Sequence, residues 1–123
     1  MRPPDIKQQL LAHLADILAV PAYSTRPDGP DAPVRFVRVT ATGGDGRHSR
    51  VAYTVQLTID SYAESTGRAA RLAMDVDEAM HALPATPLPV TTPVTGTAPA
   101  ESPDPDTTQA RYTATYQLPT IIQ

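Results

Sequence analysis

The histidines are the first residues to consider for chemistry, because few other side chains in this chain have suitable types and spacing. The chain has three histidines, His13, His48 and His81, and none is predicted to share a metal-ligand spacing with another histidine or a carboxylate. There is no cysteine, which excludes a disulfide framework, a thiolate metal site and a thiol nucleophile. The sequence therefore predicts no metal and no cofactor.

Two further patterns have the composition of catalytic motifs without their context. The segment Gly43-Gly44-Asp45-Gly46 is glycine-rich, yet a phosphate-binding loop leads into a helix, whereas this segment lies between two predicted strands. Asp75 and Asp77 are two positions apart in a predicted helix, so their carboxylates point to different faces. No serine has the context of a nucleophile elbow. We therefore expect that the chain is not an enzyme.

A set of uncharged polar residues on two predicted strands needs another explanation. These residues alternate with apolar ones, which places them on the outward face of the predicted sheet. A solvent-facing sheet usually carries more charge, so an uncharged face is compatible with a cover formed by another protein. The alternative is that threonine simply fits strands well. The subunit-interface candidates are Thr54, Gln56, Thr58, Thr113, Thr115 and Gln117.

Two predicted hairpin tips, residues 42–50 and 99–108, carry opposite charges. Projecting loops often carry partner recognition, and opposite charges on two tips favour a head-to-tail contact between copies of the chain. For the basic tip, surface decoration and contact with an acidic partner or a phosphate are the alternatives. The loop-contact candidates are Arg47, His48, Arg50, Glu101, Asp104 and Asp106.

Hydrophobic periodicity predicts the elements that must position these residues. Apolar stripes predict helices over residues 5–19 and 65–83. Alternation and β-branched content predict strands over about 34–40, 49–62 and 109–118, with 90–97 as a proline-limited edge strand. The first stripe consists of Ile6, Leu10, Leu14, Ile17 and Leu18, and the second of Ala69, Leu72, Ala73, Val76, Met80 and Leu83.

The element order is therefore α-β-β-α-β-β, which predicts an α+β fold. Two helices packed on one face of a four-stranded, mainly antiparallel sheet would bury both helix stripes and the alternating strands. The length of 123 residues suits a single domain, 1–123, and the 14 prolines predict long connections, above all the loop 22–33. The net charge of −3 argues against a nucleic-acid coat, and no apolar run suits a membrane span or a signal peptide.

Over nearly its whole length, the chain resembles tail terminator (tail completion) proteins of long-tailed phages of actinobacteria. The resemblance lies in element order and strand character, since this family has no diagnostic motif. The segments that carry it are the helix at 5–19, Pro33-Val34-Arg35-Phe36-Val37-Arg38-Val39, Tyr53-Thr54-Val55-Gln56-Leu57-Thr58-Ile59-Asp60-Ser61-Tyr62, Glu64-Ser65-Thr66-Gly67-Arg68-Ala69-Ala70 and Arg111-Tyr112-Thr113-Ala114-Thr115-Tyr116-Gln117-Leu118.

The resemblance implies a structural virion protein that forms a ring, commonly a homohexamer, at the head-proximal end of the tail tube of a siphophage. Its partners would be copies of itself, the major tail tube protein and the head–tail connector or neck proteins. Genomic DNA would pass through the ring without sequence-specific binding, after assembly in the host cytoplasm. The family implies no catalytic residue and no membrane contact. A neck protein of the same virion, and a small host α+β ligand-binding domain or enzyme, are the alternatives.

The dimensions of the chain allow such a ring. A globule of this length has a radius of gyration of about 14 Å and a breadth of roughly 30–35 Å. Six such globules leave a central hole of roughly 30 Å, which is wide enough for a DNA duplex. A mildly acidic chain also suits a conduit, because a basic lumen would bind phosphate.

Overall fold

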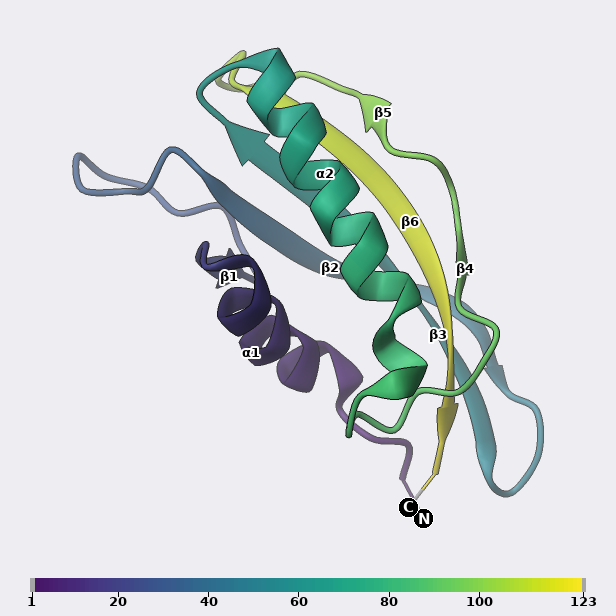
Figure 1. Cartoon of the computed structure of the whole chain (residues 1–123). Coiled ribbons are helices and arrows are strands. Elements are labelled where there is room, and N and C mark those ends of the chain that lie inside the picture. The colour runs from purple at the N-terminus through teal and green to yellow at the C-terminus, as the bar shows by residue number, and fades with distance from the viewer. Residues whose placement is uncertain (1, 123) are drawn as a thin grey trace.

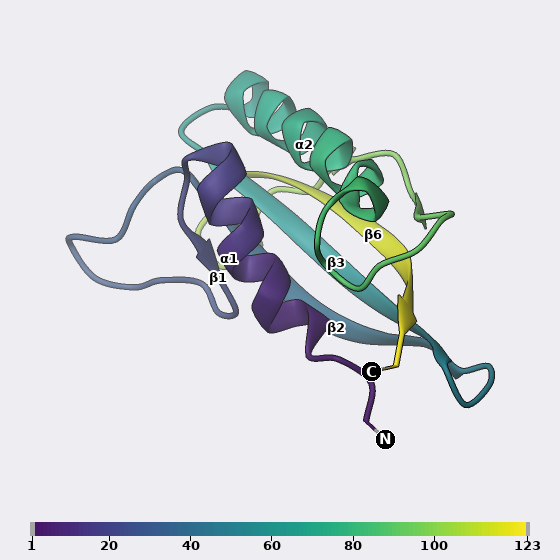
Figure 2. The ribbon, with the colours of Figure 1, turned by 60° about the horizontal axis from the view of Figure 1, so that its bottom comes forward.

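Two helices lie on the same face of a six-stranded mixed sheet (Figures 1 and 2). The structure, a computed structural model, describes residues 2–122, so Met1 and Gln123 of the predicted domain lie outside the described residues. The α+β class is confirmed, but the predicted number of four strands is wrong. The elements are α1 (Ile6–Leu18), β1 (Ala22–Tyr23), β2 (Phe36–Arg47), β3 (Ala52–Ala63), α2 (Thr66–His81), the 3₁₀ turn η1 (Leu83–Ala85), β4 (Thr95–Gly96), β5 (Ala100–Glu101) and β6 (Ala110–Ile121).

The sheet is built around three long strands, β2, β3 and β6, which pair antiparallel. The order is β1-β2-β3-β6-β4, with β5 also paired to β6, and β1 runs parallel to β2. The two-residue strands explain the difference from the predicted count. β1 lies in the predicted loop 22–33, and the predicted edge strand 90–97 pairs with β6 at Thr95–Gly96 and through a single bridge between Val90 and Thr120. Proline has no N–H for a ladder, so Pro93 and Pro99 limit pairing along this edge to short pieces.

The first helix begins as predicted but buries a narrower stripe. The Asp5 carboxylate accepts a hydrogen bond from the Gln8 N–H at 3.2 Å and caps α1. Leu10 and Leu14 are fully buried against the sheet and α2, whereas Ile17 is 53% exposed. The prediction that Ile17 belongs to the buried stripe is therefore wrong, because a pocket separates the last turn of α1 from α2 at this position.

The second helix follows its prediction closely. The Ser65 hydroxyl caps it by accepting from the Arg68 N–H at 3.3 Å, and the predicted stripe is buried. The α-helix ends at His81, two residues before the predicted end, because the following turn that contains Pro84 is a 3₁₀ turn. Leu83 is still fully buried there. No helix in residues 2–122 is long and apolar enough to cross a membrane.

The glycine-rich segment belongs to a strand, which corrects the predicted tip 42–50. β2 continues through it to Arg47, with register shifts after Ala41 and Gly43 that mark bulges, and the turn itself covers residues 48–51. Gly44 has a φ of +107°, and a Cβ there would lie 2.7 Å from the Gln56 backbone nitrogen. Glycine is therefore needed here because the β3 backbone lies too close for a side chain. The long β2–β3 hairpin extends beyond both helices (Figure 1).

Candidate functional site

The predicted polar residues lie together on the sheet face that points away from the helices. β3 and β6 are adjacent and in register, so Gln56 pairs with Gln117, and Thr58 pairs with Thr115. The residues that alternate with them, Leu57 among them, are buried in the core under the helices. The structure thus brings the candidates from both strands into one continuous surface.

Hydrogen bonds connect these side chains into a row that we call the Thr/Gln ladder. Gln117 Nε2 donates to Gln56 Oε1, and Gln56 Nε2 donates to Thr42 Oγ1 at 3.1 Å. The Thr58 and Thr115 hydroxyl oxygens are 3.0 Å apart. Sequence reasoning missed Thr42, because its segment was assigned to a hairpin tip. The ladder consists of Thr42, Gln56, Thr58, Thr115 and Gln117, and it carries no charge.

The two remaining interface candidates lie outside the ladder. Thr54 is 8% exposed, and its hydroxyl is 2.7 Å from His48 Nε2, so it does not contribute free surface. Thr113 is half-buried, and it is paired with Asp60 of β3 and with Ala100 of β5. Thr42 is exposed, and the other four residues of the Thr/Gln ladder are half-buried, as Thr113 is, so the accessible part of the candidate surface consists of the ladder and Thr113.

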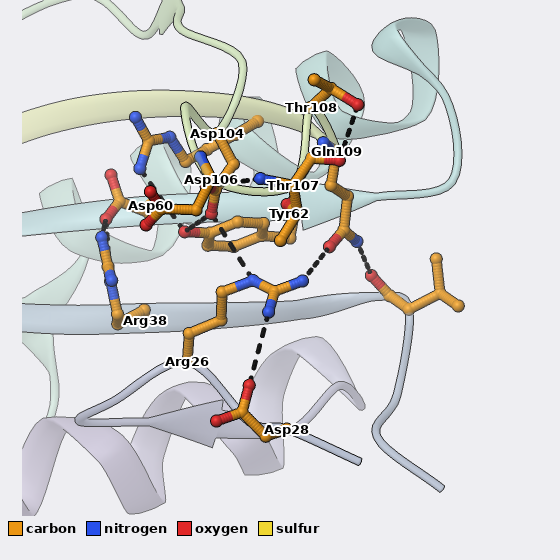
Figure 3. Close-up of polar contacts among 12 residues, drawn as sticks. Arg26, Asp28, Arg38, Asp60, Tyr62, Asp104, Asp106, Thr107, Thr108 and Gln109 are labelled. Carbon is orange, nitrogen blue, oxygen red and sulfur yellow. Dashed lines mark hydrogen bonds and ion pairs between the residues drawn. The ribbon is translucent and has the colours of Figure 1, made fainter. Parts of the chain in front are cut away.

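The other end of the same face is occupied by a cluster around Tyr62 (Figure 3). Tyr62 is fully buried and stacks on Phe36 with ring centroids 4.4 Å apart. The guanidinium groups of Arg26, Arg38 and Arg111 each lie about 6 Å from the Tyr62 ring centroid. At this distance the ring quadrupole attracts each cation.

Two buried carboxylates balance these arginines. Arg38 donates to Asp60 Oδ2 from Nε at 3.1 Å and from Nη2 at 2.6 Å. Asp104 Oδ2 accepts from the Tyr62 hydroxyl at 3.1 Å and lies 3.5 Å from Arg26 Nε. Burial acts to raise the pKa of Asp104, but hydrogen bonds from the Asp106 N–H, the Tyr62 hydroxyl and the Thr107 N–H hold that pKa below its ordinary value of 3.8. Burial also raises the pKa of Tyr62, which stays protonated and donates.

This cluster corrects the prediction of an acidic, projecting tip at 99–108. Asp104 is only 4% exposed, because its carboxylate is bound inside the cluster. Arg26 connects the loop that follows β1 to the loop that precedes β6, since its Nη2 donates to Gln109 Oε1 at 3.1 Å (Figure 3). Gln109 Nε2 in turn donates to the Val34 carbonyl at 2.7 Å. Glu101 and Asp106 remain exposed.

The basic tip lies at the opposite end of the sheet from Asp104. Arg47 pairs with Tyr53 next to the turn, whereas the other end of the hairpin pairs Phe36 with Tyr62. Arg47 Nη1 lies 3.5 Å from the Arg50 carbonyl oxygen. Two apolar residues at this end are exposed, Val51 by 59% and Ile121 by 45%. Val51 lies in the turn before β3, where alternation no longer determines burial, and Ile121 lies beyond the predicted strand 109–118.

A second polar contact that sequence reasoning missed joins α2 to β6. The Tyr116 hydroxyl donates to Asp77 Oδ1 at 2.8 Å, and His81 Nε2 lies 3.6 Å from the same oxygen. Burial and the Asp77 hydrogen bond raise the pKa of Tyr116. The four-residue spacing of Asp77 and His81 on one helix was the available signal for this contact.

Both polar clusters are held together by hydrogen bonds within the chain. Within residues 2–122, no group of three or more His, Asp and Glu side chains could hold a metal ion. The Asp104 and Asp60 oxygens are bound to arginine, tyrosine and backbone donors, which is the pattern of a structural ion cluster. The chain matches no protein-family model, and a search of curated proteins found no match either.

Proposed function

We propose that this chain is a structural phage protein of the tail terminator type, which forms a ring at the head-proximal end of the tail tube. The ring ends tube polymerisation and offers the joining surface for the neck. The observation that carries this proposal is the Thr/Gln ladder, an uncharged surface on the central strands of the sheet. The resemblance of the sequence to tail terminators supplies the identity of the assembly.

An uncharged sheet face suits burial against a second protein. Burying a charge in an interface is costly without a partner, whereas the hydroxyl and carboxamide groups of the ladder are uncharged, and most of them already bond to each other. Loops cover the Tyr62 end of the face through Arg26 and Gln109, which leaves the Thr/Gln ladder for contact. These features support a subunit that packs on a neighbour through its sheet.

The double substitution Gln56→Lys and Thr115→Lys tests this surface. It places two ammonium groups on the Thr/Gln ladder, where a covered interface would leave them desolvated and unpaired. We expect the variant to keep its fold, because lysine can extend its charge into solvent in the free subunit, and to lose ring formation. Ring formation is read by native mass spectrometry and negative-stain microscopy, and the fold by circular dichroism and thermal unfolding.

The matched control places the same two charges elsewhere. Gln9 and Thr25 are both exposed and lie outside the sheet face, so Gln9→Lys with Thr25→Lys should leave rings intact. Rings of unchanged stability in the Gln56→Lys, Thr115→Lys variant would show that the ladder is an open, solvent-facing surface. That result would remove the observation on which the proposal depends.

A further inference from the structure

A pocket between the two helices combines an apolar floor with an acidic rim. It has a volume of about 370 Å³ and lies between the last turn of α1 and the second half of α2. We call it the helix groove, and its lining consists of Ile17, Leu18, Asp75, Glu78, Ala79 and Ala82. Exposure of more than half of the Ile17 side chain leaves apolar surface open to a partner.

The negative charge of the helix groove is concentrated at Glu78. Within residues 2–122, neither Asp75 nor Glu78 forms an ion pair. Asp75 also borders a neighbouring depression lined by three arginines, among them Arg71, which offset its charge. Glu78 does not line that second depression with its three arginines, so we take its carboxylate as the counterpart of a cation that enters the groove.

The β2–β3 turn has the opposite character. The turn presents exposed Val51, and exposed Ile121 of β6 lies beside it. The Ile122 N–H donates to the Val51 carbonyl at 2.8 Å, which joins the turn to the end of β6. Arg47 and Arg50 flank this apolar surface and line a depression with Val51. We call Arg47, Arg50, Val51 and Ile121 the hairpin knob, and Figures 1 and 2 show the turn projecting past the helices at the end of the sheet.

We infer that the hairpin knob of one copy of this chain docks into the helix groove of the next copy. Apolar Val51 would cover Ile17 and the alanines, and the Arg50 guanidinium would face the Glu78 carboxylate. Knob and groove share no lining residue, since the knob lies at the β2–β3 turn and the groove lies between α1 and α2, so each copy can offer one and receive at the other. Such a heterologous contact propagates head-to-tail and closes into a ring when its rotation allows.

The closure of the ring rests on the proposed function, whereas the contact between two copies rests on the complementarity of the hairpin knob and the helix groove.

The inference also assigns a new partner to the basic tip, which the sequence analysis paired with the acidic tip at 99–108. The acidic loop before β6 has its buried carboxylate, Asp104, bound internally, so the helix groove is the better acidic counterpart. Electrostatic complementarity of this kind sets the register of an interface more than its strength.

Cysteine cross-linking tests the contact directly, because the chain contains no cysteine. One protein carries Val51→Cys and a second carries Ala82→Cys, and the two are mixed with a short bifunctional maleimide. Both positions are exposed, so neither substitution disturbs the core. We expect the mixed pair to cross-link at least about tenfold faster than a control pair of Val51→Cys with Ala98→Cys, since docking raises the effective concentration of one thiol at the other. Ala98 is exposed between β4 and β5 and does not line the helix groove.

Charge reversal provides the second arm. Arg50→Glu on the knob protein, or Glu78→Arg on the groove protein, should each lower the cross-linking rate severalfold, and the two together should restore it. Asp31→Arg on the groove protein is the matched control, because Asp31 is exposed in the loop before β2 and should have no effect. Restoration by the double reversal cannot come from misfolding of either variant.

Two results would overturn the inference. One is an equal cross-linking rate in the test and control pairs, and the other is a dominant Val51→Cys homodimer, which would indicate a symmetric knob-to-knob contact. If either occurs while the protein still forms rings on tail tubes, the docking inference fails and the proposed function stands. If the pair cross-links as expected but tube length does not depend on the protein, the contact stands and the proposed function fails.

Discussion

Replacing Asp104 with alanine should lower the free energy of unfolding by about 1–3 kcal/mol, because it removes the acceptor of the buried Tyr62 hydroxyl and an ion-pair partner of the half-buried Arg26. The Asp104 side chain is 5% exposed, lies 3.5 Å from Arg26 Nε and accepts from the Tyr62 hydroxyl. Its loss also frees the Asp106 and Thr107 N–H groups that bind Oδ1. Urea unfolding at pH 7 measures the change.

Asp106→Ala is the matched control for this substitution. Asp106 is exposed two residues away, so its loss should change stability by no more than about 0.5 kcal/mol. A cost below about 1 kcal/mol for Asp104→Ala would contradict a tightly coupled cluster, since even one unsatisfied buried group costs about that much.

The same carboxylate gives the protein an acid-sensitive component of stability. The folded pKa of Asp104 lies below its ordinary value of 3.8, so the charged form contributes stability at higher pH. That contribution is complete above the unfolded pKa and is lost as the pH falls through the folded pKa. Unfolding free energies measured from pH 6 downward should therefore converge for the wild type and Asp104→Ala as the pH falls below about 4.

Replacing Leu14 with alanine should cost about 2–5 kcal/mol, whereas Ile17→Ala, one turn later on α1, should cost no more than about 0.5 kcal/mol. Leu14 is fully buried in the core cluster between the helices and the sheet, and its loss leaves a cavity. Ile17 is 53% exposed at the helix groove. Thermal and urea unfolding of both variants measure the difference.

The comparison of Leu14→Ala with Ile17→Ala also tests which residues of α1 are buried. Similar costs at the two positions would mean that the helix buries the wider stripe that the sequence predicted, and that the helix groove is closed in solution. In the cross-linking experiment, Ile17→Ala should weaken docking without changing the fold, which separates the role of this side chain from stability.

The regular elements could be predicted because their signals are local. Period-two alternation marks β3 and β6, and spacing of three and four residues marks both helices, with Asp5 and Ser65 at their predicted N-termini. The two-residue strands could not be predicted, since their pairing depends on long strands far away in sequence. Gly44 was misread because glycine is typical both of turns and of bulges.

The candidate site was predictable to the same extent. Alternation identified the outward face of β3 and β6, but only the register of the sheet shows that Gln56 opposes Gln117 and that Thr42 extends the row. Asp104 illustrates the limit of sequence reasoning. A proline-rich acidic stretch indicates an exposed turn, and its burial depends on Tyr62, 42 residues earlier in the chain.

The length of tail tubes tests the proposed function most directly. Tubes are assembled from the major tail tube protein of the genome that encodes this chain, with and without the chain present, and their lengths are measured by negative-stain electron microscopy. The account predicts tubes of limited, uniform length that carry a ring at one end when the chain is present, and tubes that continue to grow when it is absent. Tubes of the same length distribution under both conditions, or binding of the chain to the capsid portal instead of the tube end, would contradict it.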